Sequence, residues 1–354
     1  MPLSPWFSFC LNWLRFGAAF VVLWGHGQFL MGRGESSFIG SYGHTMVILF
    51  FVMSGYIIAR TTKDGIPDIQ TYLVHRLVRV YIVALPVVLL SFLIFGFYYY
   101  FGFDYFLEYE NKFNFIHFLK SLFFLNHTWS SGDYLILNDP FWSLCFEFWY
   151  YLLFALIFYK NSIFYRLLAI AIFLSMGPSL WVLFPIWLMG VLLVYLKPVN
   201  LDKNLLLLGA VVFFCMALAV NGFGVDVYVQ SYLSTHFPQI WILGPATKFI
   251  TDNLVGLAFL ISLWFLSSIQ VFALRPKFVK IGSVLAGFSF SLYLMHNLIF
   301  MIFDTTLGDD RLSQTEYVLA TIVVVGLCYL FSRVTEAHTS KFRRFVLGKL
   351  ASRA

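Results

Sequence analysis

Charged side chains are scarce in this chain of 354 residues. Only 11% of its residues are Asp, Glu, Lys or Arg, whereas 60% are hydrophobic and 21% are aromatic. This composition lies far outside the range of soluble globular domains, so we interpret the chain as a polytopic integral membrane protein.

Cysteine is scarce as well. Cys10, Cys145, Cys215 and Cys328 lie in apolar surroundings and show no CxxC spacing, so we predict neither a disulfide framework nor a metal site. The N-terminus lacks a basic leader and a small-residue cleavage site, and we therefore expect the first apolar run to stay in the mature protein. The net charge is +6, but the basic residues recur in short clusters between apolar runs. That pattern indicates membrane orientation and excludes nucleic acid as a partner.

About ten apolar segments are long enough to be predicted as transmembrane helices. Ser4 and Pro5 predict an N-cap and a first helical residue, and Gly177-Pro178 predicts a tight joint between the fifth and sixth spans. Residues 111–127 are apolar but short, which favours a re-entrant or interfacial helix. We expect spans near residues 11–30, 44–60, 79–101, 141–159, 163–179, 181–196, 204–221, 247–270, 282–304 and 315–333. The predicted fold class is an all-α membrane helical bundle.

Lys and Arg are concentrated in one set of loops, which places those loops in the cytoplasm. The opposite loops hold only four basic residues, Arg33, Lys112, Lys120 and Arg311, alongside acids such as Asp104, Glu108, Glu110, Asp133, Asp139, Asp309 and Asp310. The segment 104–139 is therefore predicted to be extracytoplasmic. Both termini are therefore predicted to be cytoplasmic. The cytoplasmic set comprises Arg60, Lys63, Arg76, Arg79, Lys160, Arg166, Lys197, Lys203, Arg275, Lys277, Lys280, Arg333, Lys341, Arg343, Arg344, Lys349 and Arg353.

Arg15 and His26 are unusual inside the first apolar run. Eleven positions at about 100° each bring both side chains onto one helix face, with a rise of about 16 Å between them. A cation and an imidazole in the hydrocarbon region cost several kcal/mol unless they face a polar interior, so they indicate a functional cavity. A snorkelling Arg15 and a structural core His26 are the alternative interpretation.

A carboxylate in the fourth span needs a partner, and His26 and Arg15 are the candidates for Glu147. Counted from the outer end of its span, Glu147 shares a depth with His26, at about 10 Å and 8 Å respectively. A structural salt bridge is the alternative.

Three further motifs carry polar residues. Ser54-Gly55 is a small-residue notch where helices pack closely or a ligand reaches the backbone. Arg76 and Arg79 lie on one face and suit either phosphate or lipid headgroups. Ser289, Tyr293 and His296 also share one helix face. This face suits interhelical hydrogen bonds and a substrate groove equally well.

Taken together, five motifs resemble those of the membrane-bound acyltransferase family 3. They are the Arg15 to His26 spacing, FFVMSGYIIAR, HRLVRVYIVALP, WSLCFEFWYYLL and FSFSLYLMH, and they span nearly the whole chain. His75 stands where the family commonly has an arginine, and Phe290 where it commonly has a tyrosine.

The resemblance implies a ten-helix inner-membrane O-acyltransferase of bacterial type. Such a protein would move an acyl group, often acetyl, from cytoplasmic acyl-CoA to a hydroxyl of an extracytoplasmic or lipid-linked glycan. It implies that Arg15 and His26 are the essential pair, that Arg60 closes the second motif, and that Glu147 is the essential carboxylate.

The site predicted from the motifs has three parts. His26 and Glu147 are the catalytic candidates, with His26 either a general base or an acyl relay. The donor phosphates are assigned to Arg15, Arg60, Arg76 and Arg79. The substrate contacts are assigned to Ser54, Trp142, Ser143, Ser289, Tyr293 and His296. Acyl-CoA is a co-substrate, and no permanently bound cofactor is expected.

We expect residues 1–345 to form one transmembrane acyltransferase domain, followed by a short basic cytoplasmic tail at 346–354, without an appended extracytoplasmic domain. The expected partners are acyl-CoA, a hydroxyl-bearing acceptor and the lipid bilayer, and the oligomeric state is open, a homo-oligomer included. A transporter or flippase is the main alternative, because ten spans with intramembrane ionisable residues also describe proton-coupled carriers. A purely structural scaffold would leave the burial of Arg15, His26 and Glu147 unexplained.

Overall fold

The computed structural model describes residues 4–33, 38–102, 110–129, 133–159, 162–270, 274–307 and 312–352. Most of these residues are helical, and the only β pairing among them is an isolated bridge between Leu135 and Asn138. The α-helices are α1 (Pro5–Gln28), α2 (Gly43–Gly65), α3 (Ile69–Tyr100), α4 (Phe115–Leu122), α5 (Phe141–Tyr159), α6 (Ile163–Met176), α7 (Pro178–Leu193), α8 (Lys203–Gly222), α9 (Val225–His236), α10 (Phe249–Ser268), α11 (Pro276–Gly287), α12 (Ser289–Leu307), α13 (Gln314–Val334) and α14 (Thr339–Ala351).

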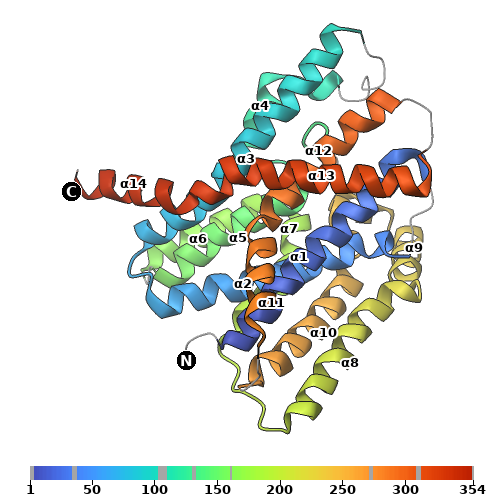
Figure 1. Ribbon diagram of the computed structural model, residues 1–354. Helices are drawn as coiled ribbons and strands as arrows, with labels where there is room; N and C mark the ends of the chain where they lie inside the picture. The colour runs from blue at the N-terminus through green and yellow to red at the C-terminus, as the bar shows by residue number, and fades with distance from the viewer. Residues whose placement is uncertain are drawn as a thin grey trace.

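Each of the ten expected spans is occupied by helix, which confirms the predicted all-α membrane bundle (Figure 1). Seven helical segments in the described part of the chain are long and apolar enough to cross a membrane. The bent pair of α11 and α12 would make an eighth, and α6 and α7 are shorter apolar helices. The chain is therefore a multi-pass membrane protein.

Local sequence signals set several helix boundaries. The Ser4 hydroxyl accepts the amide of Phe7 at 3.1 Å, and Pro5 opens α1, as predicted. Gly177, at φ 87°, separates α6 from α7, and Pro178 begins the second of these helices. Ser313 and Glu316 form a reciprocal capping box at the start of α13.

The ninth expected span differs from the prediction, because it is broken rather than continuous. α11 and α12 meet at Phe288 with a bend of 50°. A break frees backbone amides at the start of the second helix, and these need acceptors. The Glu336 carboxylate accepts the Ser291 amide at 2.9 Å. This carboxylate lies in the 3₁₀ turn η5 (Glu336–His338), just after α13, so a residue distant in sequence stabilises the break.

α2 is the most buried of the candidate spans and packs against α1, α7 and α10. Its contact with α7 depends on two glycines. A Cβ on Gly55 would lie 2.0 Å from the Trp187 carbonyl oxygen, and a Cβ on Gly190 would lie 2.0 Å from the Val52 carbonyl oxygen. Of the two roles predicted for Ser54-Gly55, Gly55 therefore has the first, because it allows close packing of α2 against α7.

Two helical regions were not anticipated in their observed form. α9 and the 3₁₀ segment η4 (Pro238–Ala246) fill the connection between the seventh and eighth expected spans. α14 follows α13 almost end to end and packs against α3 (Figure 1). The expected boundary between domain and tail, at residues 345 and 346, falls inside α14.

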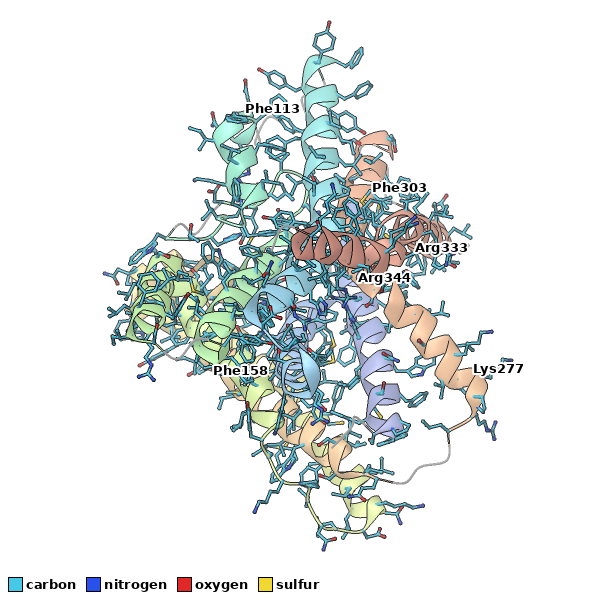
Figure 2. The ribbon with its side chains drawn as sticks, turned by 90° about the vertical axis from the view of Figure 1, so that its left-hand side faces the viewer. Phe113, Phe158, Lys277, Phe303, Arg333 and Arg344 are labelled. Carbon is cyan, nitrogen blue, oxygen red and sulfur yellow. The ribbon has the colours of Figure 1, made fainter. Side chains whose placement is uncertain are left out.

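The start of α1 and the end of α14 lie on the left side of the molecule in Figure 1, and α9 lies on the right. On the predicted orientation, the cytoplasmic side is at the left and bottom of this view, since the start of α8 lies at the bottom. In Figure 2, Lys277 on α11 lies far from Phe113, which belongs to a predicted outer loop. Lys160, Arg353, and the side chain of Arg33, which also entered the orientation argument, are outside the described residues or side chains.

The orientation can be tested by cysteine labelling of intact cells. In a variant without the four native cysteines, a cysteine at position 133 should react with a membrane-impermeant reagent, whereas one at position 349 should react only after the membrane is opened. The reverse labelling pattern would show that the orientation is wrong.

The outer loop between α4 and α5 has a strained backbone. Phe124, His127, Trp129 and Leu137 all have positive φ, between 55° and 68°. The Asp133 carboxylate fixes the loop to α4, because it lies 3.0 Å from His117 Nδ1 and 2.8 Å from Lys120 Nζ. Burial opposes ionisation of Asp133, but these two partners outweigh it and hold its pKa well below its usual value.

Burial lowers the pKa of His127 from 6.5 to about 4. The nearby charges of Asp133 and Lys112 act in opposite directions on it. Between pH 6.5 and about 4, the folded loop keeps His127 neutral while the opened loop takes up a proton. Acidification through this window therefore destabilises the closed loop, by at most about 3 kcal/mol, and no further loss from His127 follows below it.

We expect hydrogen exchange in residues 123–138 to accelerate as the pH falls from 6.5 to 4. His127→Asn removes the titrating ring and keeps a residue that tolerates positive φ. That variant should show little of the acceleration, once corrected for intrinsic exchange rates. An unchanged pH dependence in the variant would assign the effect to another group.

Candidate active site

A cavity of about 580 Å³ lies between α1, α2, α3, α5, α12 and α14. It extends from Gly65 and Ile66, at the predicted cytoplasmic end of α2, to Val47 nearer the outer end. Most of the predicted site residues line it, namely Arg15, Ser54, Arg76, Arg79, Ser143, Glu147, Ser289 and Tyr293. The structure therefore brings together motifs that are up to about 280 residues apart in the sequence.

Arginines dominate the cytoplasmic part of the cavity. Arg15 comes from α1, Arg76 and Arg79 from α3, and Arg343 from α14. The Arg76 guanidinium donates to Thr61 Oγ1 at 2.8 Å and lies over the Tyr72 ring, 5.5 Å from its centroid. Arg79 lies 5.7 Å from the centroid of the Phe290 ring. These contacts hold two cations in place without neutralising their charges.

Arg60 does not belong to this lining, contrary to the predicted donor contact. The cavity face of α2 carries Ser54, Ile57 and Thr61. With about 100° per residue, Arg60 lies roughly 100° away from the middle of this face. Its place in the second motif therefore reflects another role than lining the cavity.

Glu147 lies in the cavity wall and accepts hydrogen bonds from the Ser54 and Tyr151 hydroxyls. The Trp187 indole donates to Ser54 Oγ at 3.3 Å and supports this arrangement. Glu147 is also within electrostatic range of Arg15. The expected pairing of Glu147 with His26 is wrong, because the ring contacts of His26 are made by other groups. Equal depth along two helices did not bring these side chains together.

His26 contacts His296 instead. His26 Nδ1 lies 3.0 Å from the Val22 carbonyl oxygen and 3.2 Å from His296 Nε2. His296 Nδ1 lies 2.9 Å from the Leu292 carbonyl oxygen. His296 was predicted as a substrate contact in a groove, but it is fully buried behind His26 and does not line the cavity.

These contacts fix the tautomers of both neutral rings. A carbonyl oxygen only accepts, so each Nδ1 that faces one must carry the hydrogen. His296 Nε2 then has a lone pair and accepts from His26 Nδ1–H. The remaining nitrogen, His26 Nε2, carries a lone pair and can act as a base or a nucleophile. His296 thus fixes the orientation that Glu147 was expected to fix.

Glycines on both sides of His26 allow its neighbours to approach closely. A Cβ on Gly25 would lie 2.6 Å from the carbonyl oxygen of Gly40, which is in the 3₁₀ turn η2 (Gly40–Tyr42). A Cβ on Gly27 would lie 2.6 Å from the Phe300 ring of α12. The Gly-His-Gly sequence therefore presses the outer end of α1 against two elements and limits the movement of His26.

Tyr293 stands between the cavity and the histidine pair. Its hydroxyl is 2.6 Å from Ser143 Oγ, and its ring is 6.2 Å from the His296 ring and 5.6 Å from the Phe50 ring, centroid to centroid. His26 itself is half-buried and does not line the cavity. The histidine pair therefore lies just beyond the outer end of the cavity. Trp142, another predicted substrate contact, is adjacent to Ser143 in sequence but stacks on His44 outside the lining.

Several site residues were missed from the sequence. Thr339 and Arg343 of α14 line the cavity, and Tyr151 binds Glu147. In the sequence, the basic run KFRR at 341–344 indicated only the membrane orientation, because no local pattern predicts that α14 packs against α3. The described residues contain no group of three or more His, Cys, Asp or Glu side chains that could hold a metal ion.

Residues 9–333 match a family described as an acyltransferase domain. This match covers nearly the whole chain and defines the class of the protein as a membrane acyltransferase. The chain belongs to acyltransferase family 3, which confirms the resemblance seen in its five motifs. Comparison with curated proteins and with solved structures found no match.

Proposed function

We propose that this acyltransferase moves a short acyl group, most simply acetyl, from cytoplasmic acyl-CoA to a hydroxyl of an extracytoplasmic or lipid-linked glycan in a bacterial inner membrane. One observation carries the proposal. A single cavity carries four arginines toward its cytoplasmic end and reaches Tyr293, whose ring lies beside that of His296, and His296 in turn contacts His26, the histidine whose Nε2 carries the lone pair.

The arginines suit the donor because acyl-CoA is polyanionic and guanidinium groups bind phosphate oxygens strongly. Arg15 lies about 16 Å from His26 along the helix axis, a distance comparable to an extended pantetheine arm. A donor anchored by its phosphates near Arg15 therefore presents its thioester near the outer end of the cavity. The acyl end reaches His26 past the rings of Phe50 and Tyr293.

The transfer step follows from the tautomer of His26. Its Nε2 lone pair takes the proton of the acceptor hydroxyl while the hydroxyl oxygen attacks the thioester carbonyl carbon. The C–S bond then breaks, and the CoA thiolate leaves with the proton that His26 gives back. Throughout this step His26 Nδ1–H donates to Val22 and His296, which stabilises the positive charge of the imidazolium without a carboxylate.

The donor side can be tested by acetyl-CoA binding to the purified protein in detergent. Arg343→Ala should weaken binding about tenfold, because one charge-assisted phosphate contact is lost. Arg344 is the matched control, since it is exposed, is absent from the cavity lining and donates a hydrogen bond to the Ser340 carbonyl oxygen of its own helix (Figure 2). Arg344→Ala should bind acetyl-CoA normally. Equal affinities of both variants would remove this cavity from consideration as the donor site.

A further inference from the structure

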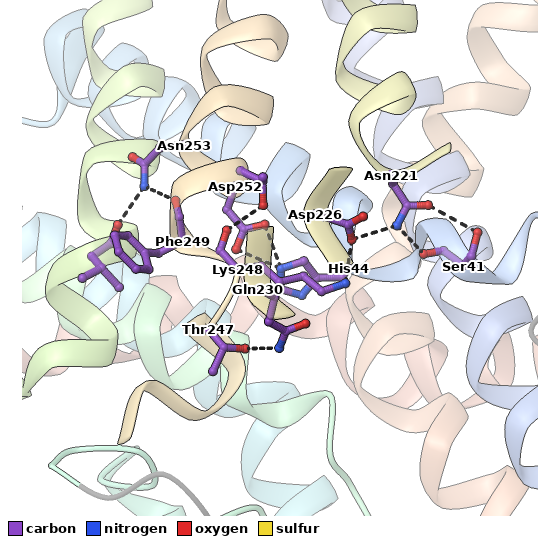
Figure 3. A network of polar contacts seen from close by, with 12 residues as sticks. Ser41, His44, Asn221, Asp226, Gln230, Thr247, Lys248, Phe249, Asp252 and Asn253 are labelled. Carbon is purple, nitrogen blue, oxygen red and sulfur yellow. Dashed lines mark hydrogen bonds and ion pairs between the residues drawn. The ribbon is translucent and has the colours of Figure 1, made fainter. Parts of the chain in front are cut away.

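A second polar cluster lies at the predicted outer ends of α2, α8, α9 and α10 (Figure 3). Its centre is His44, whose Nε2 is 3.0 Å from both carboxylate oxygens of Asp252. Beside it, Lys248 Nζ donates to Asp226 Oδ2 at 2.6 Å. The catalytic scheme described above uses none of these residues.

His44 lies on α2 toward the predicted outer side of the cavity. It precedes the cavity residue Val47 by one turn, but its side chain is turned about 100° away from the face of α2 that carries Ser54, Ile57 and Thr61. Its ring stacks on Trp142 at 6.0 Å between centroids, and Trp142 precedes the cavity residue Ser143. The contact between His44 and Trp142 therefore lies next to the cavity, because both residues belong to helices that line it, α2 and α5.

The His44–Asp252 pair leaves one nitrogen available for a ligand. Asp252 is only 4% exposed, so its charge needs the partner that it has. The carboxylate accepts from Nε2–H, and this leaves the Nδ1 lone pair of neutral His44 as an acceptor. The His44 side chain is 27% exposed, so a hydroxyl group can reach it.

The charges around His44 favour an uncharged ligand. Lys248 compensates Asp226, and Asp252 has His44 as its partner. Asp226 Oδ1 is buried and has no hydrogen-bond partner among the described residues, so it adds to the negative potential beside His44. An anionic ligand would meet two carboxylates here. A hydroxyl group of a neutral ligand would instead find a hydrogen-bond acceptor, the Nδ1 lone pair of His44.

We propose that His44 and Asp252 form the acceptor subsite, and that it takes an uncharged polyhydroxyl group such as a neutral sugar ring. This inference rests on the proposed function. His44 Nδ1 accepts a hydrogen bond from one hydroxyl of the acceptor and holds the sugar over the outer end of the cavity. Asp252 does not contact the sugar and is a positioning residue, because it fixes the tautomer of His44.

Saturation-transfer NMR on the purified full-length protein tests this subsite. The probes are methyl β-D-glucopyranoside, which is neutral, and sodium glucuronate, which is anionic. The test variant is the double substitution His44→Phe with Asp252→Asn, which keeps the stack on Trp142, removes the lone pair and leaves no buried unpaired charge. The matched control is His236→Gln, since His236 also stacks on an aromatic ring, that of Tyr232, but contacts no carboxylate among the described residues.

We expect the wild-type protein and His236→Gln to bind the neutral glucoside in preference to glucuronate. The double variant should bind the glucoside about fivefold more weakly, which is the effect of one lost hydrogen bond. Three results would overturn the subsite: no signal from the glucoside with the wild type, equal affinity in the double variant, or preference for glucuronate.

Acetyl-CoA binding, measured on the same samples, separates the subsite from the proposed function. The double variant should bind acetyl-CoA normally, which also shows that it is folded. If the wild type fails to bind acetyl-CoA, the donor half of the proposed function is wrong, and the sugar signals still decide the subsite. If the double variant alone loses acetyl-CoA binding, His44 and Asp252 are structural residues and the subsite is overturned.

Discussion

His26→Ala should abolish acyl transfer, with a loss on the order of 10³-fold or more in kcat, because the variant has no base at the outer end of the cavity. Acetyl-CoA binding should be preserved, since His26 does not line the cavity in which the donor phosphates would bind. The measurement is transfer of labelled acetyl from acetyl-CoA by purified protein, together with donor affinity on the same preparation.

His296 provides the internal control for this prediction. His296→Phe keeps a buried ring but removes the acceptor of the His26 Nδ1 hydrogen bond. Because Val22 still accepts from Nδ1, the tautomer of His26 should persist. We therefore expect a smaller loss than in His26→Ala, accompanied by a changed pH profile of kcat. Near-normal transfer by His26→Ala would end the proposed role of His26.

An acyl-histidine intermediate is the alternative mechanism for His26. The same series of variants distinguishes it from direct transfer. A covalent acyl-histidine would give ping-pong kinetics and an acyl group trapped on His26 in the absence of acceptor. Direct transfer requires both substrates to be bound at once, and no acyl group is trapped. Within the proposed function we favour direct transfer, because the Nε2 lone pair of His26 would suffice as a general base and no relay state is needed.

Much of the fold could be predicted from one sequence because the signals are local. Apolar runs indicated the ten helical segments, Ser4 and Pro5 marked the start of α1, and Gly177-Pro178 marked the joint between α6 and α7, which begins three residues before the predicted sixth span. The ninth span was read as continuous, since the residue that caps its break, Glu336, is 45 positions away from Ser291. Local patterns hold no information about such a partner.

The depth of the site residues along their helices could be predicted from the sequence, but the contacts between their side chains could not. Rise per residue gave the depths of Arg15, His26 and Glu147, and the arginines that line the cavity do gather toward the predicted cytoplasmic side. Depth is only one coordinate, however, and the rotation of α5 turns Glu147 toward Ser54 of α2 instead of His26, while Tyr151, one turn further along α5, also donates to it. The same limit hid the His44–Asp252 pair, whose members are 208 residues apart.

Glu147→Gln should separate donor binding from catalysis. Glu147 is a carboxylate in the wall of a cavity whose lining also carries four arginines. On the proposed function, a negative charge at this position would repel the donor phosphates and keep them beside the arginines, with the thioester directed outward. Gln keeps the shape and loses the charge. We therefore expect acetyl-CoA to bind severalfold more tightly, in less productive positions, while kcat falls on the order of 10²-fold.

Two variants make the interpretation specific. Tyr151→Phe removes one hydroxyl that donates to Glu147 and leaves the charge, so its donor affinity should stay normal and its kcat should fall less than that of Glu147→Gln. Asp133→Asn removes a carboxylate from the outer loop, away from the cavity lining, and should leave acetyl-CoA affinity unchanged. If Glu147→Gln loses donor affinity and kcat together, the carboxylate holds the cavity in shape and does not orient the donor. If it keeps kcat within about threefold of the wild type, the charge of Glu147 has no part in the transfer.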